Sequence, residues 1–146
     1  MYSKILVPFD GSEHAVAALK YAKELAALVP GTTIDVVTAL TASAIGVEPG
    51  TSTLGYDQYK AMLDKGIAWA KDGIVEKFGA ELEGDNITVE VIAGSGAALA
   101  ISKYCADHGC DLIVMGRRGL GAVRGMLGSV SFAILREAEV PVITVK

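Results

Sequence analysis

The stretch that decides the fold reads DLIVMGRRGLGAVRGMLGS, from Asp111 to Ser129. It begins with a short apolar run, which is typical of a strand in a parallel sheet covered by helices on both faces. Five of the chain's 17 glycines then fall between Gly116 and Gly128. Glycine allows positive φ and lets backbone N–H groups converge on an anion without a Cβ in the way. A strand followed by such a loop predicts a phosphate-binding turn.

The end of this loop adds a second reason to expect an anion. Gly128 and Ser129 open a predicted helix, whose unpaired N–H groups and dipole favour a phosphate. Three of the chain's four arginines, Arg117, Arg118 and Arg124, lie in the loop, and guanidinium groups suit phosphate oxygens. The loop is neither a P-loop, because GxxxxGK[ST] is absent, nor the dinucleotide fingerprint, because no GxGxxG follows the first strand.

Outward from this stretch, short apolar runs alternate with segments that carry apolar residues at helical spacing. Strands are predicted over 4–8, 33–40, 87–93, 111–115 and 140–145, and helices over 12–29, 59–74, 97–108 and 130–138. Ser12 is the predicted N-cap of the first helix. Alternating strands and helices indicate a parallel sheet with right-handed crossovers and helices on both faces.

The carboxyl ends of such strands are where ligands bind in open α/β sheets. This rule selects four segments, namely 8–12, the residues from Ala39 onward, 93–97 and the glycine loop 116–129. We therefore expect these segments to meet at one site.

Length and composition argue against several classes of protein. With 146 residues the chain suits one domain, 1–146. A net charge of −4 argues against nucleic-acid binding. The two cysteines, Cys105 and Cys110, are too few for a disulfide framework, and the apolar run near the N-terminus is too short to span a membrane or to export the chain. We expect a cytoplasmic protein without a membrane anchor.

Several motifs, in order along the whole chain, resemble the universal stress protein family. They are Val7-Pro-Phe-Asp-Gly-Ser12, Gly94 with Ala97, Asp111-Leu-Ile-Val-Met-Gly116, Gly116-x-x-Gly119 with Gly128-Ser-Val-Ser131, and Val140-Pro-Val142. The resemblance implies a small parallel five-stranded sheet, usually dimeric through the last strand. We expect an open, doubly wound, Rossmann-like sheet with strand order 3-2-1-4-5. It also implies an adenine-nucleotide site of the family's ATP-binding branch, whose pattern is G-x2-G-x9-G-[S/T].

By that resemblance, Gly116, Gly119, Gly128 and Ser129 would hold ribose and phosphates, Pro8 and Asp10 would lie against the adenosine, and Ala39 would contact the adenine. Arg117 and Val130, which flank these positions, complete the predicted contacts. The ligand would be ATP, ADP or AMP, with Mg²⁺ or Mn²⁺ screening the phosphates. In this chain eight residues separate Gly119 from Gly128, where the family pattern has nine, so the triphosphate end is where binding should differ.

Three functions remain open on the sequence. The first is a stress-response module that binds a nucleotide and hydrolyses it slowly or not at all, because no general base is identifiable near the loop. The second is a nucleotide-free module that binds client proteins, and the third is an enzyme that activates a substrate with ATP. The apolar edge strand Val140–Val145 predicts a homodimer. No catalytic residue and no metal ligand is assigned.

Overall fold

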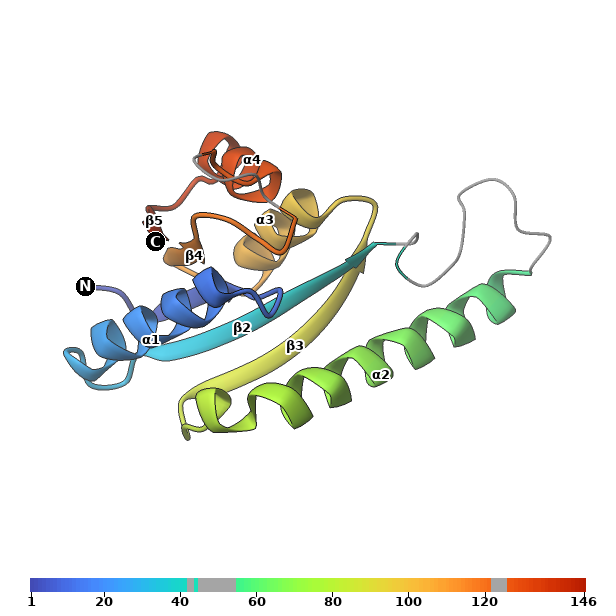
Figure 1. The fold of residues 1–146 in the computed structure, drawn as a ribbon, viewed down its shortest axis with the longest axis horizontal. Helices are drawn as coiled ribbons and strands as arrows, with labels where there is room; N and C mark the ends of the chain where they lie inside the picture. Colours follow the sequence, from blue (N-terminus) through green and yellow to red (C-terminus); the bar gives the residue numbers. More distant parts are fainter. Residues whose placement is uncertain (42–43, 45–54, 122–125) are drawn as a thin grey trace.

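The strands form one parallel sheet in the order β3-β2-β1-β4-β5, as Figure 1 shows for the computed structural model. The structure describes residues 1–41, 44, 55–121 and 126–146. The elements are β1 (Lys4–Pro8), α1 (Glu13–Ala27), β2 (Thr33–Thr41), α2 (Tyr56–Leu82), β3 (Ile87–Gly94), α3 (Ala97–Asp107), β4 (Leu112–Gly116), α4 (Ser129–Glu137) and β5 (Val142–Val145). The prediction of a doubly wound sheet with this strand order is confirmed.

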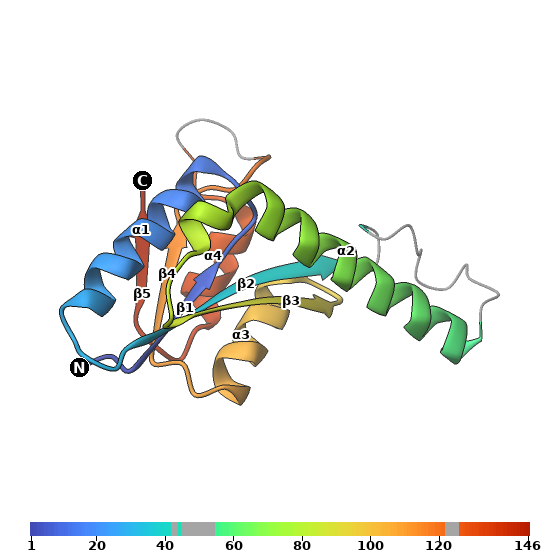
Figure 2. The ribbon, with the colours of Figure 1, turned by 90° about the horizontal axis from the view of Figure 1, so that it is seen from below.

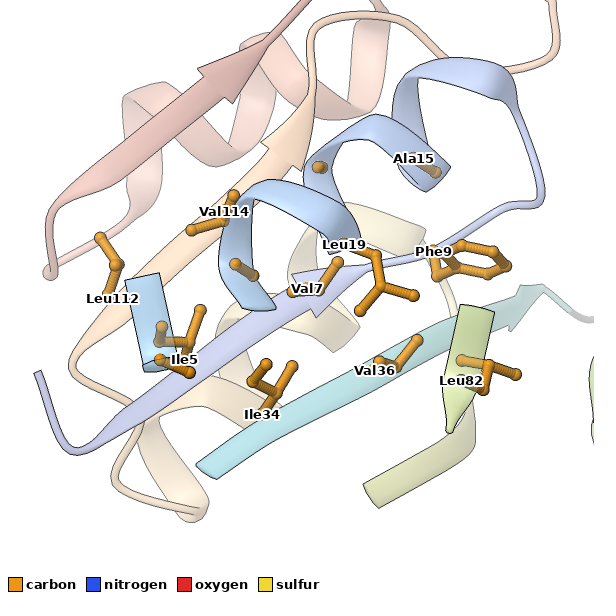
Figure 3. Close-up of a cluster of buried hydrophobic side chains, with 13 residues drawn as sticks. Ile5, Val7, Phe9, Ala15, Leu19, Ile34, Val36, Leu82, Leu112 and Val114 are labelled. Carbon is orange, nitrogen blue, oxygen red and sulfur yellow. The ribbon is translucent and has the colours of Figure 1, made fainter. Parts of the chain in front are cut away.

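Each face of the sheet carries its own core, because successive side chains of a strand point to opposite faces. Ile5 and Val7 of β1 pack with α1 and the end of α2, as Figure 3 shows. Leu6, between them, packs on the opposite face with Ile101 of α3 and Ile134 of α4. The central strands β1 and β4 are therefore apolar on both faces, which explains their uninterrupted runs in the sequence.

Helix α1 begins as its sequence predicts. The side chain of Ser12 accepts a hydrogen bond from the backbone N–H of Ala15 at 3.2 Å, which satisfies one of the free donors of the first turn. Gly11, before it, has a φ of 79°, a conformation that glycine adopts readily. This turn places the residues after β1 at the carboxyl edge of the sheet.

Helix α2 is longer than the predicted range 59–74, and its C-terminal part packs against the core. Met62 is 41% exposed and Trp69 is 81% exposed. The contact with the core comes from the end of the helix, where Ile74, Phe78 and Leu82 pack beside α1. Figure 2 shows the beginning of α2 extending past β2 and β3, so no strand lies beneath its first half. Within the described ranges, no helix combines the length and apolarity that a membrane span requires.

The N-terminus is tied to the start of β4 by the carboxylate of Asp111. Its Oδ2 accepts hydrogen bonds from the N–H of Ser3 at 2.8 Å and the hydroxyl of Ser3 at 2.7 Å, and its Oδ1 accepts one from the N–H of Lys4 at 3.1 Å. Burial alone would raise the pKa of Asp111, but these hydrogen bonds outweigh it and lower the pKa below its ordinary value of 3.8.

Replacing the Asp111 carboxylate tests whether these hydrogen bonds stabilise the protein. We expect Asp111→Asn to lower the free energy of unfolding at neutral pH by about 1 kcal/mol, because an amide cannot accept all three bonds. A lowered folded-state pKa stabilises the fold above pH 3.8, and this stabilisation is lost as the pH falls through the folded value. Urea unfolding of both proteins from pH 7 down to pH 2 should therefore show two curves that converge in acid. Curves that stay parallel would contradict it.

Candidate functional site

A cavity of about 520 Å³ opens at the carboxyl ends of the strands. Its lining comes from segments far apart in the sequence, namely the turn after β1, the end of β2, α3, and the residues that join β4 to α4. The lining residues are Pro8, Phe9, Asp10, Ala15, Val37, Thr38, Ala39, Ala97, Ile101, Met115, Gly116, Arg118, Gly119, Leu120, Gly121, Met126, Leu127, Gly128, Ser129, Val130, Ser131 and Ile134. The four segments expected to meet do so here.

Most of the predicted site residues line this cavity. They are Pro8, Asp10, Ala39, Gly116, Gly119, Gly128, Ser129 and Val130. Arg117 does not line it. Its N–H donates to the carbonyl of Val145 of β5 at 2.8 Å, and its carbonyl accepts from the N–H of Gly128 at 3.1 Å. The neighbouring Arg118 lines the cavity in its place. Arg124 lies outside the described residues.

Asp10 joins the turn after β1 to the glycine loop. Its Oδ1 accepts from the N–H of Ser12 at 3.0 Å, and its Oδ2 accepts from the N–H of Leu120 at 3.2 Å. A Cβ added to Gly119 would collide with the same Oδ2. Glycine is therefore required at position 119 for the loop to approach the carboxylate this closely.

The N-terminus of α4 reaches the rim of the cavity without a side-chain cap. Its N-cap is Gly128, which has no side chain to accept a bond from the first turn. The first N–H groups of a helix have no partner within the helix. They therefore offer donors to a ligand at Ser129 and Val130, and the exposed hydroxyl of Ser129 lies beside them. Helix α3 also has a glycine N-cap, Gly96, without a side-chain bond.

Gly116 supports the site through packing. A Cβ at this position would lie 2.7 Å from the carbonyl carbon of His14 and 2.9 Å from the nitrogen of Ala15. The close approach of β4 to α1 therefore depends on the missing side chain. The carbonyl of Gly116 also accepts from the buried hydroxyl of Ser131 at 2.9 Å. This bond ties the first turn of α4 to the end of β4.

The apolar floor of the cavity was missed in the sequence. It consists of Val37, Ile101, Met115 and Ile134, all of which are buried. They come from β2, α3, β4 and α4, and each is an ordinary core residue in its own element. The one usable signal was position, because Met115 comes near the carboxyl end of its strand. Thr38, which donates to the carbonyl of Phe9 at 2.6 Å, was missed as well.

The charges around the cavity come from two groups. Asp10 and Arg118 are the acidic and basic side chains among its described lining residues. The Nε of Arg118 is buried and has no hydrogen-bond partner in the described part of the chain. No three His, Cys, Asp or Glu residues among those described are grouped as metal ligands. A cation at this site would therefore depend on its ligand for most of its coordination.

Comparison with known proteins identifies the family. The sequence model of the universal stress protein family matches residues 1–146. The chain belongs to the universal stress protein family. This universal stress protein is 35% identical over 147 residues to one from Thermus aquaticus, with all of both chains covered. It is 33% identical over 152 residues to one from Methanocaldococcus jannaschii, covering 100% of this chain and 83% of the relative.

Solved structures of similar proteins share its fold. The hypothetical protein MJ0577 has a TM-score of 0.79 and 27% identity, covering 100% of this chain and 96% of the other. The universal stress protein UspA from Lactobacillus plantarum has a TM-score of 0.75 and 25% identity, covering 99% and 98%. A universal stress protein in complex with cAMP has a TM-score of 0.65 and 22% identity, covering 99% and 97%, which indicates the fold alone.

Proposed function

We propose that this universal stress protein is a stress-response module that binds an adenine nucleotide, ATP, ADP or AMP, in the cavity at the strand ends. The observation that carries the proposal is the combination, in one cavity, of an apolar floor and an uncapped helix N-terminus. The floor suits the flat base and the helix N-terminus suits the phosphates. The two ends are built from different segments of the chain.

The phosphate end is formed by the start of α4 and the glycine loop. The N–H groups at Ser129 and Val130 and the Ser129 hydroxyl are available to phosphate oxygens. The guanidinium of Arg118, whose Nε has no partner among the described residues, supplies positive charge on the same rim. These groups support the proposal that an anion binds beside Gly128.

The adenosine end is formed by β1, β2 and the floor. Ala39, which is partly exposed, offers an apolar surface to the base, and the buried side chains of Val37 and Met115 also line the cavity. Each oxygen of Asp10 uses one lone pair on a backbone N–H, so each can still accept a hydrogen bond from a ribose hydroxyl. Pro8 lies along the same wall. This arrangement supports the contacts that the family resemblance implies for Pro8, Asp10 and Ala39.

Hydrolysis, if it occurs, should be slow. Among the described lining residues Asp10 is the only side chain that could act as a general base, and both its oxygens already accept backbone hydrogen bonds. Phosphoryl transfer requires a positioned nucleophile and charge stabilisation. Mg²⁺ or Mn²⁺ would fit as an ion carried by the phosphates, because Asp10 alone could add a carboxylate. The ion would then screen the negative charge of the phosphates.

Calorimetric titration with ATP, ADP and AMP, with and without Mg²⁺, tests the proposal. We expect saturable binding of one nucleotide per chain, with Mg²⁺ strengthening binding of ATP more than of AMP, because ATP carries more charge. The same samples, followed for phosphate release, should show little turnover. Absence of saturable binding by all three nucleotides would refute the proposal and favour a nucleotide-free module that binds client proteins. Rapid turnover would favour an enzyme.

We also propose that the protein is a cytoplasmic homodimer joined through its last strand, Val140–Val145. Supporting this, β5 (Val142–Val145) is an edge strand of the sheet, and exposed edges invite pairing. The preceding helix α4 exposes Phe132 and Leu135, at 58% and 44%. Both cysteines are free, as is usual in a reducing compartment.

A charged residue substituted on the exposed face of α4 tests whether the protein forms the proposed dimer. We expect the parent to sediment as a dimer and Phe132→Glu as a monomer, because an interface desolvates the new carboxylate without giving it a partner. Leu28→Glu is the matched control, since Leu28 is 78% exposed at the end of α1, and it should remain dimeric. A monomeric parent would refute the proposal. A Phe132→Glu protein that dimerises as the parent does would show that α4 lies outside the interface and that only the last strand can form it.

A further inference from the structure

The two cysteines both line a cavity other than the one at the strand ends. This cavity, of about 230 Å³, is lined by Cys105, Cys110, Ser102, Ile113 and Val140, among others. Both cysteines are 5% exposed and belong to the same core cluster. The cavity lies outside the proposed nucleotide site, since the two share no lining residue. Nucleotide binding therefore gives these two thiols no role.

The local backbone brings the two thiols together. Helix α3 ends in a turn in which Gly109 has a φ of 64°, the N–H of Cys110 donates to the carbonyl of Cys105 at 2.9 Å, and that of Gly109 donates to Ala106 at 3.3 Å. This is the Schellman motif, in which the residue after the glycine contacts the helix residue five positions earlier. That contact is usually between two apolar side chains, whereas here both residues are cysteines.

The distances suit a covalent bond between the thiols. Because the N–H of Cys110 is hydrogen-bonded to the carbonyl of Cys105 at 2.9 Å, standard backbone dimensions limit the separation of the two Cα atoms to about 6.8 Å. Disulfides span Cα separations of about 4.4 to 6.8 Å. The Sγ of Cys105 also lies 3.6 Å from the carbonyl oxygen of Cys110. Both cysteines line the same small cavity and belong to the same core cluster.

We propose that Cys105 and Cys110 form a reversible intramolecular disulfide that closes the turn between α3 and β4 when the protein meets a low-molecular-weight disulfide such as glutathione disulfide. The thiolate of one cysteine attacks the S–S bond of the reagent, forms a mixed disulfide and releases one glutathione thiolate. The second cysteine thiolate then attacks the protein sulfur of the mixed disulfide and expels the second glutathione. Two protein thiols are oxidised and one glutathione disulfide is reduced to two thiols, and the two cysteine protons pass through water to the expelled glutathione thiolates.

Burial of the two thiols should slow this reaction. Desolvation is the largest cause that raises the pKa of both thiols, that of Cys110 to about 12, and the thiolate is the reactive form. Exchange should therefore be slow in the folded protein, and the dithiol is its resting state in a reducing compartment. An equilibrium measurement avoids this kinetic barrier. It reports whether the folded geometry favours the bond.

The test is equilibration of the full-length protein in buffers of reduced and oxidised glutathione, followed by acid quenching, alkylation and mass spectrometry. We expect one product that has lost two hydrogen atoms and binds no alkylating reagent. Its equilibrium constant should be about tenfold higher in native buffer than in concentrated urea, because the folded turn holds the thiols together. By linkage, the oxidised protein should unfold at a higher urea concentration than the reduced protein.

Single variants provide the matched controls. Cys105→Ser and Cys110→Ser should each stop at the mixed disulfide with glutathione, without loss of two hydrogen atoms. An equilibrium constant in native buffer that is equal to or lower than that in urea would overturn the proposal. A parent protein that accumulates the mixed disulfide, or that forms only disulfides between chains, would overturn it as well. Each of these results would mean that the folded turn holds the sulfurs apart.

Discussion

Gly116→Ala should destabilise the protein by about 2 to 3 kcal/mol and lower its melting temperature by about 8 °C. The new Cβ would lie 2.7 Å from the carbonyl carbon of His14 and 2.9 Å from the nitrogen of Ala15. Both atoms belong to the backbone of α1, so no side chain can rotate away to make room. Either α1 shifts or the end of β4 does, and each shift disturbs the core between them. Urea unfolding and calorimetry measure the loss.

Gly128→Ala is the matched control for this variant. A Cβ at Gly128 would lie 3.4 Å from the Cα of Arg118, an ordinary contact. Its φ of −64° and ψ of 151° suit any residue, and a change from glycine to alanine at an N-cap costs only a few tenths of a kcal/mol or slightly more. We expect its stability to stay within about 1 kcal/mol of the parent. Equal midpoints for the two variants would contradict the packing role of Gly116.

Gly119→Val should weaken ATP binding by about 100-fold, or about 2.7 kcal/mol. At this position a Cβ collides with the Oδ2 of Asp10, and a β-branched side chain fills part of the cavity as well. The carboxylate must move, which breaks its bond to the N–H of Leu120 and releases the loop that frames the phosphate end. Because Gly119 is exposed and Asp10 can rotate, the fold itself should lose little stability. Calorimetric titration measures the affinity.

The control for this variant is Gly73→Val. Gly73 lies in α2, and a Cβ there meets no atom within 4 Å. Its affinity for ATP should match that of the parent, which separates the loss at Gly119 from a general effect of valine. If Gly119→Val binds ATP as tightly as Gly73→Val does, the phosphates do not lie against the glycine loop. A parent that binds no nucleotide would refute the proposed function itself, whatever the variants do.

Much of the fold could be predicted because its signals are local. The apolar run of β4, the N-cap Ser12 and the alternation of strands with helices each depend on residues a few positions apart. The prediction for α2 was partly wrong for the opposite reason. The spacing of its apolar residues correctly indicated a helix, but which turns meet the core depends on where β2 and β3 end. Met62 is therefore 41% exposed, while Leu82 is buried.

The sequence by itself determined the order of strands and helices, the family, and the glycine-rich loop after β4. The order of elements and the loop follow from periodicity and from residue types whose backbone preferences act over a few positions, whereas the family follows from the resemblance of the motifs along the chain. Only the tertiary structure decided that Arg118 rather than Arg117 lines the cavity. It also decided that Gly116 is a packing residue and that four separate elements supply the apolar floor. Contacts between distant segments depend on strand order and register, which bring together side chains that no local pattern relates.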